Sequence, residues 1–204
     1  MTTAPPFVVI TIWEHVEPMV RGDRYEDPLD EALEDRGEVV GGGSQFTPET
    51  GIEYVNIEVE LESLDSIPLV ISTLERRGVP KGSELRYTKD GSEVVEEFGV
   101  AECLGLFIDG VGLPEAVYEE SDINQIADDI MEALDGTGFI RASFMGATET
   151  SILIFGRDAE AMYSKLEKLL SEVLLLQNSR IVIRHGKSSL KPREFRLPFH
   201  KSEP

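Results

Sequence analysis

The stretch Ile52–Leu61, IEYVNIEVEL, decides the fold because apolar and polar residues alternate along its whole length. One side of the extended chain carries four aliphatic residues: Val55, Ile57, Val59 and Leu61. The other side carries an aromatic and three polar residues: Tyr54, Asn56, Glu58 and Glu60. A period of two predicts a strand with one face in the core and one face open.

Upstream of this strand, the pattern predicts another strand, a loop and a helix. Phe7–Val16 alternates in the same way and is the first strand. A loop, Glu17–Glu26, follows it. Asp27 is typical of a helix N-cap and Pro28 of the first helical position, and Gly37 ends this helix.

Two more strands and a second helix complete the first unit. Glu38–Phe46 is the next strand, and the turn Thr47–Gly51 joins it to the opening stretch as a hairpin. A helix over Asp65–Arg77 and a short strand, Glu84–Thr88, follow. Lys89–Gly99 is predicted to be a polar hairpin and linker.

The second half of the chain predicts the same order of elements. Its strands are Ala101–Gly110, Phe139–Met145, Thr150–Phe155 and Arg180–His185. Ser121 or Asp122 caps its first helix, and Asp158 caps its second. The tail that follows, with Pro192 and Pro198, is irregular or an added edge segment.

Two βαββαβ units in tandem make an α+β protein, with two antiparallel sheets and helices on one face of each. Right-handed crossovers place the first and third strands of each unit at the centre of its sheet and the second and fourth at the edges. The predicted boundaries are residues 1–90 for the first domain, 100–186 for the second, and 187–204 for a basic C-terminal tail.

The chain of 204 residues has a net charge of −20. A surface this acidic argues against nucleic acid and anionic membranes as partners. Residues 178–204 differ, with seven Lys and Arg against two Asp and Glu. This tail either lies on the acidic body, held partly by its charge, or anchors a separate acidic partner.

Targeting signals and catalytic motifs are not predicted. No run of about 18 apolar residues occurs, and no Lys or Arg precedes the first apolar run, which argues against a transmembrane helix and a signal peptide. The single Cys103 cannot form an internal disulfide, which favours a reducing, cytoplasmic location and a role as a small buried core residue. We predict no catalytic residue and no cofactor.

The open face of the first sheet is the candidate binding surface. Its predicted site residues are Trp13, His15, Tyr54, Asn56 and Glu58. An apolar patch with a few polar groups marks a packing surface or a binding site. The face therefore packs on the second domain or a second subunit, or it binds a small molecule or peptide. His15 and the nearby acids lack a metal-ligand spacing, so no metal site is predicted.

The run Gly41, Gly42, Gly43 lies inside a predicted strand and leads into a hairpin. A phosphate-binding loop would instead run from a strand into a helix and carry a Lys or a spaced glycine motif. The glycines therefore predict a bulge or a close backbone approach at an edge strand. Such an edge is a candidate for pairing with the edge near Ala142–Met145 or with another subunit.

The βαββαβ order resembles the ferredoxin-like superfold, and its duplication resembles proteins built from paired ACT-like modules, over about Phe7–His185. ACT-like modules bind amino acids at domain interfaces through a glycine-containing loop, and the corresponding loop here is Val16–Tyr25 with Gly22. RNA-binding members of the superfold use aromatic residues on the open sheet face, as Trp13 and Tyr54 would. The neighbouring glutamates and the net charge argue against RNA.

These observations predict an interaction module without enzymatic activity, whose partner is another protein or a second copy of the chain in a homodimer. The contact would use the acidic surface, the open sheet face or the glycine edge. Two alternatives stay open. One is a small-ligand sensor with a site between the domains or at Trp13 and Tyr54, and the other is an immunity-type protein that neutralises a basic toxin.

Overall fold

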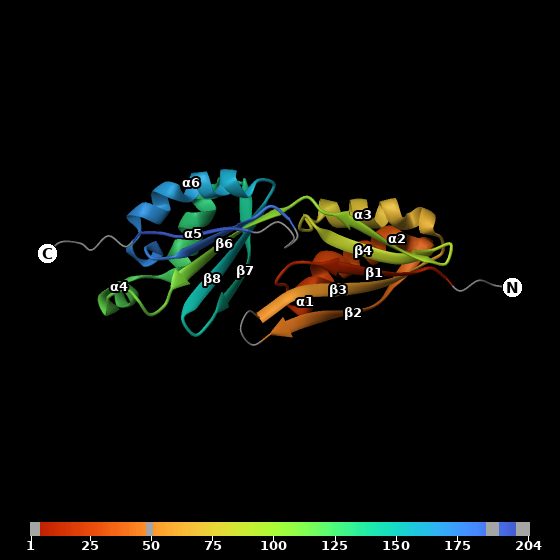
Figure 1. Cartoon of the computed structure of the whole chain (residues 1–204), viewed down its shortest axis with the longest axis horizontal. Helices are drawn as coiled ribbons and strands as arrows, with labels where there is room; N and C mark the ends of the chain where they lie inside the picture. The colour runs from red at the N-terminus through yellow and green to blue at the C-terminus, as the bar shows by residue number, and fades with distance from the viewer. Residues whose placement is uncertain (1–4, 48–50, 187–191, 199–204) are drawn as a thin grey trace. The chain divides into compact units, whose positions relative to one another are not determined.

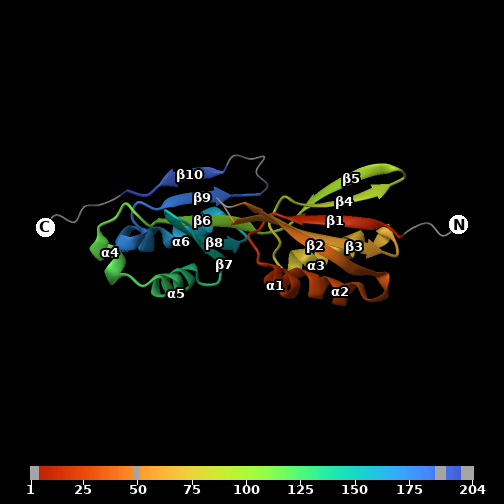
Figure 2. The same cartoon turned by 90° about the horizontal axis from the view of Figure 1, so that it is seen from below.

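The computed structural model describes residues 5–47, 51–186 and 192–198. The chain divides into two compact units, Met1–Val100 and Ala101–Pro204. Within the described residues, each unit combines helices with one five-stranded antiparallel sheet (Figures 1 and 2). The protein is therefore α+β, as predicted. No helix in the described ranges is long and apolar enough to cross a membrane.

The first unit contains four strands close to their predicted positions and one further strand. Its elements in order are β1 (Phe7–Ile12), α1 (Pro18–Arg21), a π-helical turn (Gly22–Glu26), α2 (Asp27–Leu33), a 3-10 turn (Glu34–Arg36), β2 (Gly37–Thr47), β3 (Gly51–Leu61), a second 3-10 turn (Leu64–Ser66), α3 (Ile67–Arg76), β4 (Ser83–Lys89) and β5 (Ser92–Phe98). The strand order is β2-β3-β1-β4-β5. The middle of the predicted hairpin turn, residues 48–50, lies outside the described residues.

The fourth strand of this unit is not an edge, which corrects the predicted sheet. The segment Lys89–Gly99, predicted as a polar hairpin and linker, contains β5, and every residue of β5 pairs with β4 from Lys89 opposite Ser92 to Ser83 opposite Phe98. The positive φ of +52° at Asp90 and +75° at Gly91 makes the two-residue turn between them. The edges of this sheet are therefore β2 and β5.

The segment Glu17–Glu26, predicted as a loop, is helical, so this prediction was wrong. Pro18–Arg21 forms α1, and in the π-helical turn the N–H of Asp27 bonds to the carbonyl of Gly22. Asp27 therefore continues a helix and does not cap one.

A contact with a distant helix explains why the sequence pattern misled at this point. Pro28 has no N–H with which to bond the carbonyl of Arg24 one turn earlier. The Nε of Arg77, just after α3, donates to that carbonyl at 3.0 Å instead. A helix that continues past a proline in this way depends on a tertiary partner, which the local sequence does not reveal.

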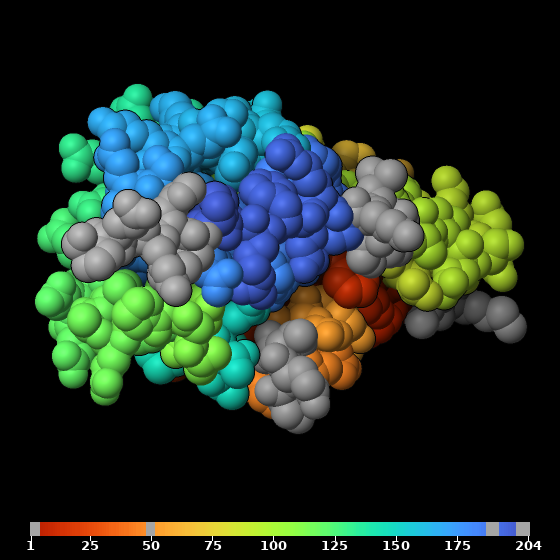
Figure 3. All heavy atoms as spheres, turned by 60° about the vertical axis from the view of Figure 1, so that its left-hand side comes forward, coloured from red at the N-terminus to blue at the C-terminus, as the bar shows by residue number. Residues whose placement is uncertain are grey.

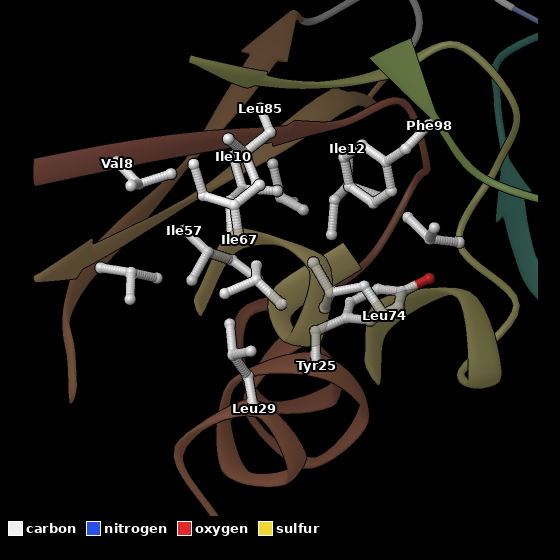
Figure 4. Close-up of a cluster of buried hydrophobic side chains, with 14 of the residues drawn as sticks. Val8, Ile10, Ile12, Tyr25, Leu29, Ile57, Ile67, Leu74, Leu85 and Phe98 are labelled. Carbon is white, nitrogen blue, oxygen red and sulfur yellow. The ribbon is translucent and has the colours of Figure 1, made fainter. Parts of the chain in front are cut away.

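The core of the first unit lies between the sheet and its helices, with α1 to α3 on one side (Figure 2). Val8, Ile10 and Ile12 of β1 are fully buried. They face Tyr25 and Leu29 from the helical layer (Figure 4). The period-two pattern therefore assigns the buried face of β1 and β3 correctly, and the other face carries no helix.

The second unit repeats this arrangement with its own additions. Its elements in order are β6 (Glu102–Asp109), α4 (Glu115–Glu120), α5 (Ile123–Leu134), β7 (Gly138–Met145), β8 (Glu149–Gly156), α6 (Ala159–Glu172), β9 (Arg180–Arg184) and β10 (Arg193–Arg196). The strand order is β10-β9-β6-β8-β7. Asp122 and Asp158 cap α5 and α6, as predicted, by accepting the N–H groups of Asn124 and Ala161. The short α4 was not predicted.

The C-terminal segment adds an edge strand to this sheet, which was one of the two alternatives predicted for the tail. β9 was predicted to be an edge strand, and this prediction was wrong. β10 pairs antiparallel with β9, and atoms of both strands reach the surface (Figure 3, blue). Arg193 Nη1 lies 2.6 Å from Glu160 Oε2, and Arg196 Nη2 lies 3.5 Å from Glu149 Oε1. The described part of the tail therefore lies on the body of the protein and is held partly by charge. Lys187, Lys191 and Lys201 lie outside the described residues.

Candidate binding surface

The open face of the first sheet brings together four of the five predicted site residues. In the register of β1 and β3, Thr11 lies opposite Asn56, and its Oγ1 donates to Asn56 Oδ1 at 2.9 Å. Glu58 lies two residues further along the same face of β3. The rings of Trp13 and Tyr54 contact each other with centroids 4.9 Å apart. Tyr54, Asn56 and Glu58 therefore lie at alternate positions along one face of β3, and Trp13 contacts Tyr54 at one end of this row.

His15 does not belong to this row. β1 ends at Ile12, and the chain turns so that the N–H of Glu14 bonds to the Ile12 carbonyl at 3.0 Å. His15 Nε2 lies 3.9 Å from Glu17 Oε1, whereas Glu58 lies opposite Val9, six positions away along the chain. Within the described residues, no group of three His, Cys, Asp or Glu side chains could hold a metal ion.

Carboxylates surround the apolar centre of the same face. Glu38 of β2 lies directly opposite Glu60 of β3, and Glu84 of β4 lies directly opposite Glu97 of β5. By register and alternation, the open face carries six glutamates, here called the acidic face: Glu38, Glu58, Glu60, Glu84, Glu93 and Glu97. Among the described strand residues on this side, Arg86 is the single basic residue, 3.8 Å from Glu84 and 3.6 Å from Glu93.

Apolar residues lie between these carboxylates. Phe7, opposite Glu60, is 46% exposed, and Val95, opposite Arg86, is 44% exposed. Val9, two residues after Phe7 on β1, is half-buried, and Arg86 of β4 lies between Val9 and Val95. The acidic face thus has an apolar strip, interrupted at Arg86 and bordered by negative charge, a composition suited to a partner that is both apolar and basic.

The glycine run lies in the edge strand β2, where the sequence predicted it. The register shifts between Val39 and Gly41, which confirms a bulge at this point. A Cβ on Gly41 would lie 2.9 Å from Glu58 Oε2, and a Cβ on Gly42 would lie 2.8 Å from Glu26 Oε1. These two glycines therefore let carboxylates lie close against both faces of the edge strand.

A buried ion pair at the end of β1 was missed by sequence reasoning. The side chain of Glu14 is fully buried, and its Oε1 lies 2.5 Å from Arg24 Nη1. The buried Tyr25 hydroxyl donates to the other oxygen of the same carboxylate. The pair ties the end of β1 to the π-helical turn. A glutamate among apolar strand residues gives a weak sequence signal, because an exposed glutamate has the same local pattern.

In the second unit, Asp109 ties the end of β6 to the residues before β9. It accepts the N–H groups of Val111 and Gly112, each at 2.9 Å, and the amide of Asn178. Burial raises the pKa of Asp109, but these hydrogen bonds and the charge of Arg196 outweigh burial and hold its pKa below the ordinary value. The ionised carboxylate is therefore the form that stabilises this junction.

We expect the stability of the second unit to fall less steeply with decreasing pH in Asp109→Asn than in wild type. A folded pKa below the unfolded value of about 3.9 means that the stabilisation is complete above that pH and is lost as pH falls toward the folded pKa. Thermal unfolding followed by circular dichroism between about pH 2 and about pH 7 measures this. Asp128→Asn, on an exposed position of α5, removes the same charge and should leave the slope unchanged. Equal slopes in wild type and Asp109→Asn would contradict the assignment.

A small pocket in the second unit lies between α6 and the C-terminal segment. Its volume is about 180 Å³, and its lining residues are Tyr163, Glu167, Leu170, Ser171, Gln177, Leu197 and Pro198. None of the predicted site residues contributes to it. It is a separate feature from the acidic face.

Comparisons with known proteins do not assign a family. No family model matches the sequence, and no curated protein matches it. A solved structure described as an unknown protein from Galdieria sulphuraria is 14% identical, covers 89% of this chain and 98% of that chain, and has a TM-score of 0.30. A TM-score this low supports no conclusion about the fold or the function of this chain.

Proposed function

We propose that the first unit is a protein-interaction module without enzymatic activity, which binds a Lys- and Arg-rich protein through the acidic face. The observation that carries the proposal is the direct opposition of Glu38 and Glu60 on neighbouring strands. Among the described residues, neither carboxylate forms an ion pair, and like charges in directly opposite positions destabilise a sheet. A basic partner would relieve this repulsion.

The apolar strip supports the same proposal. Phe7 and Val95 are each nearly half exposed between the glutamates. An interface with an apolar centre and charged rim matches the usual anatomy of protein contacts. Charge of one sign around the strip would speed association with a basic surface and exclude acidic competitors. A basic toxin neutralised by this chain is one partner with that chemistry.

Binding of a synthetic peptide of alternating lysine and valine tests the proposal. We expect the triple variant Glu38→Gln/Glu58→Gln/Glu60→Gln to bind this peptide about tenfold more weakly than wild type, since each exposed ion pair contributes up to about 1 kcal/mol. Isothermal titration calorimetry measures the change. The affinity of the wild-type chain should also fall as NaCl is raised.

A matched variant separates the acidic face from the net charge of the whole chain. Glu31→Gln/Glu34→Gln/Asp35→Asn removes the same three charges from exposed positions at the end of α2 and the turn after it. We expect this control to bind the peptide within about twofold of wild type. An equal loss in both triple variants would mean that bulk charge, and not this face, attracts the peptide.

The fold of each unit is proposed to be an extended ferredoxin-like unit. The strand order β2-β3-β1-β4 with two helical crossovers supports this in the first unit, and β7-β8-β6-β9 supports it in the second. β5 and β10 would be additions at one edge of each sheet. An experimental structure with any other connection between these strands would rule it out.

A further inference from the structure

The outer edge of β2 contains a regular stretch without charge. β2 is an edge strand of eleven residues, longer than most strands in globular proteins (Figure 1). Between its two register shifts, Gly41–Gln45 pairs regularly with β3 and carries the sequence GGGSQ. Natural edge strands are usually protected by Lys, Pro or a bulge. This stretch, here called the glycine window, has none of these between its two ends.

Gly43 has no reason to be glycine within the described part of the chain. Its φ is not among the positive values, and a Cβ added to it meets no described atom within 4 Å. Glycine inside a strand costs about 0.5–1 kcal/mol relative to alanine. Gly41 and Gly42 are explained by the carboxylates that lie against them, whereas Gly43 faces open space. A residue kept small against open space indicates that something outside the chain approaches it closely.

We propose that β2 pairs antiparallel with β2 of a second copy of this chain, with the two Gly43 residues directly opposite each other. In this register Gly41 lies opposite Gln45 of the second copy, and Gly42 lies opposite Ser44. The glycines at one end of each glycine window therefore lie opposite the two residues with side chains, Ser44 and Gln45, of the other copy. A two-fold contact needs this kind of self-complementary surface.

The side chains on each face fit the same register. Gln45 pairs with Tyr54 and Gly41 pairs with Glu58, so both window residues belong to the open face. Gln45 of the second copy therefore reaches the place where the Glu58 carboxylate lies against Gly41, and its amide is a suitable donor. Ser44 belongs to the helix-covered face, as does Gly42. Arg21 Nη1 lies 3.5 Å from Ser44 Oγ within one copy, so the Ser44 hydroxyl keeps this hydrogen-bond donor in the dimer.

Charge separates this contact from the proposed binding of a basic partner. Two copies that each carry −20 repel one another, so salt strengthens their association by screening. A basic partner on the acidic face shows the opposite dependence. The two proposals therefore fail independently, because one is tested without any partner and the other with the peptide.

Disulfide trapping tests the register directly. In a full-length Cys103→Ser background, Gly43→Cys places two thiols opposite each other with Cβ atoms about 4.5–5.5 Å apart, from which a small backbone shift brings them into disulfide range. Mild oxidation should therefore convert most of this variant to a covalent dimer. Gln45→Cys is the matched control on the same strand, since its two copies would be about 13 Å apart along the strands and should not cross-link.

A second variant keeps the test decisive. Gly43→Glu places two carboxylates opposite each other and should make the chain monomeric in sedimentation equilibrium, while the open space at Gly43 lets the variant keep the wild-type circular dichroism spectrum. Wild type should form dimers, and their dissociation constant should decrease as NaCl is raised from about 0.05 M to about 0.5 M. A monomeric wild type at every salt concentration would overturn the proposal. So would equal cross-linking of Gly43→Cys and Gln45→Cys, because it would show contact in another register.

Discussion

Replacing Arg24 by Met is expected to lower the free energy of unfolding of the first unit by about 3 kcal/mol. The side chain of Glu14 is fully buried, and Arg24 Nη1 is the cation at 2.5 Å from it. Without Arg24, the buried Glu14 carboxylate keeps its desolvation cost and loses the positive charge of this ion pair. Denaturant unfolding followed by tryptophan fluorescence measures the loss. Trp13 is the only tryptophan in the sequence, so the signal comes from the first unit.

Arg36→Met is the matched control for this substitution. It removes the same charge and the same side chain, but the Arg36 guanidinium donates to the backbone carbonyls of Leu33 and Ala32, at 3.2 and 2.9 Å, and forms no ion pair with the described residues. We expect a loss below about 1 kcal/mol, because these bonds are at the surface. If both variants lost the same stability, the change in net charge would explain the result and the buried pair would not.

The strands were predictable where burial alternates along the chain itself. β1 and β3 follow the period of two because one face contacts the core and the other does not. β5 was not predicted, because its residues Ser92–Phe98 are mostly polar and exposed, and among the described strands it pairs with β4 alone. An edge strand with solvent on two sides has little local signal. Its assignment depends on a pairing that the sequence does not display.

The same limit explains which part of the binding surface was found. Alternation on β1 and β3 was enough to group Trp13, Tyr54, Asn56 and Glu58. Glu93 and Glu97 joined the acidic face only when β5 was known to be a strand of the same sheet. Their place depends on a register between strands. The burial of Glu14 likewise depends on a turn that was expected to be a loop.

Replacing Gly99 by Ala is expected to destabilise the first unit by about 3 kcal/mol. Gly99 has a φ of +111°, which side-chain-bearing residues rarely adopt, and an added Cβ would lie 2.1 Å from the carbonyl oxygen of Pro80. The chain cannot easily move away. The N–H of Gly99 bonds to Glu75 Oε1 at 3.2 Å, and the N–H of Val100 bonds to the Val79 carbonyl at 2.9 Å. Unfolding followed by Trp13 fluorescence measures the loss.

Gly91→Ala shows how much of this effect comes from backbone conformation alone. Gly91 has a φ of +75°, and no described atom lies within 4 Å of an added Cβ, so its replacement should cost about 1 kcal/mol. The difference between the two variants then measures the clash with the Pro80 carbonyl. Equal losses would show that this carbonyl moves aside at little cost. If Gly99→Ala instead shifts β5, it displaces Glu93 and Glu97, so peptide binding to the acidic face should weaken along with stability.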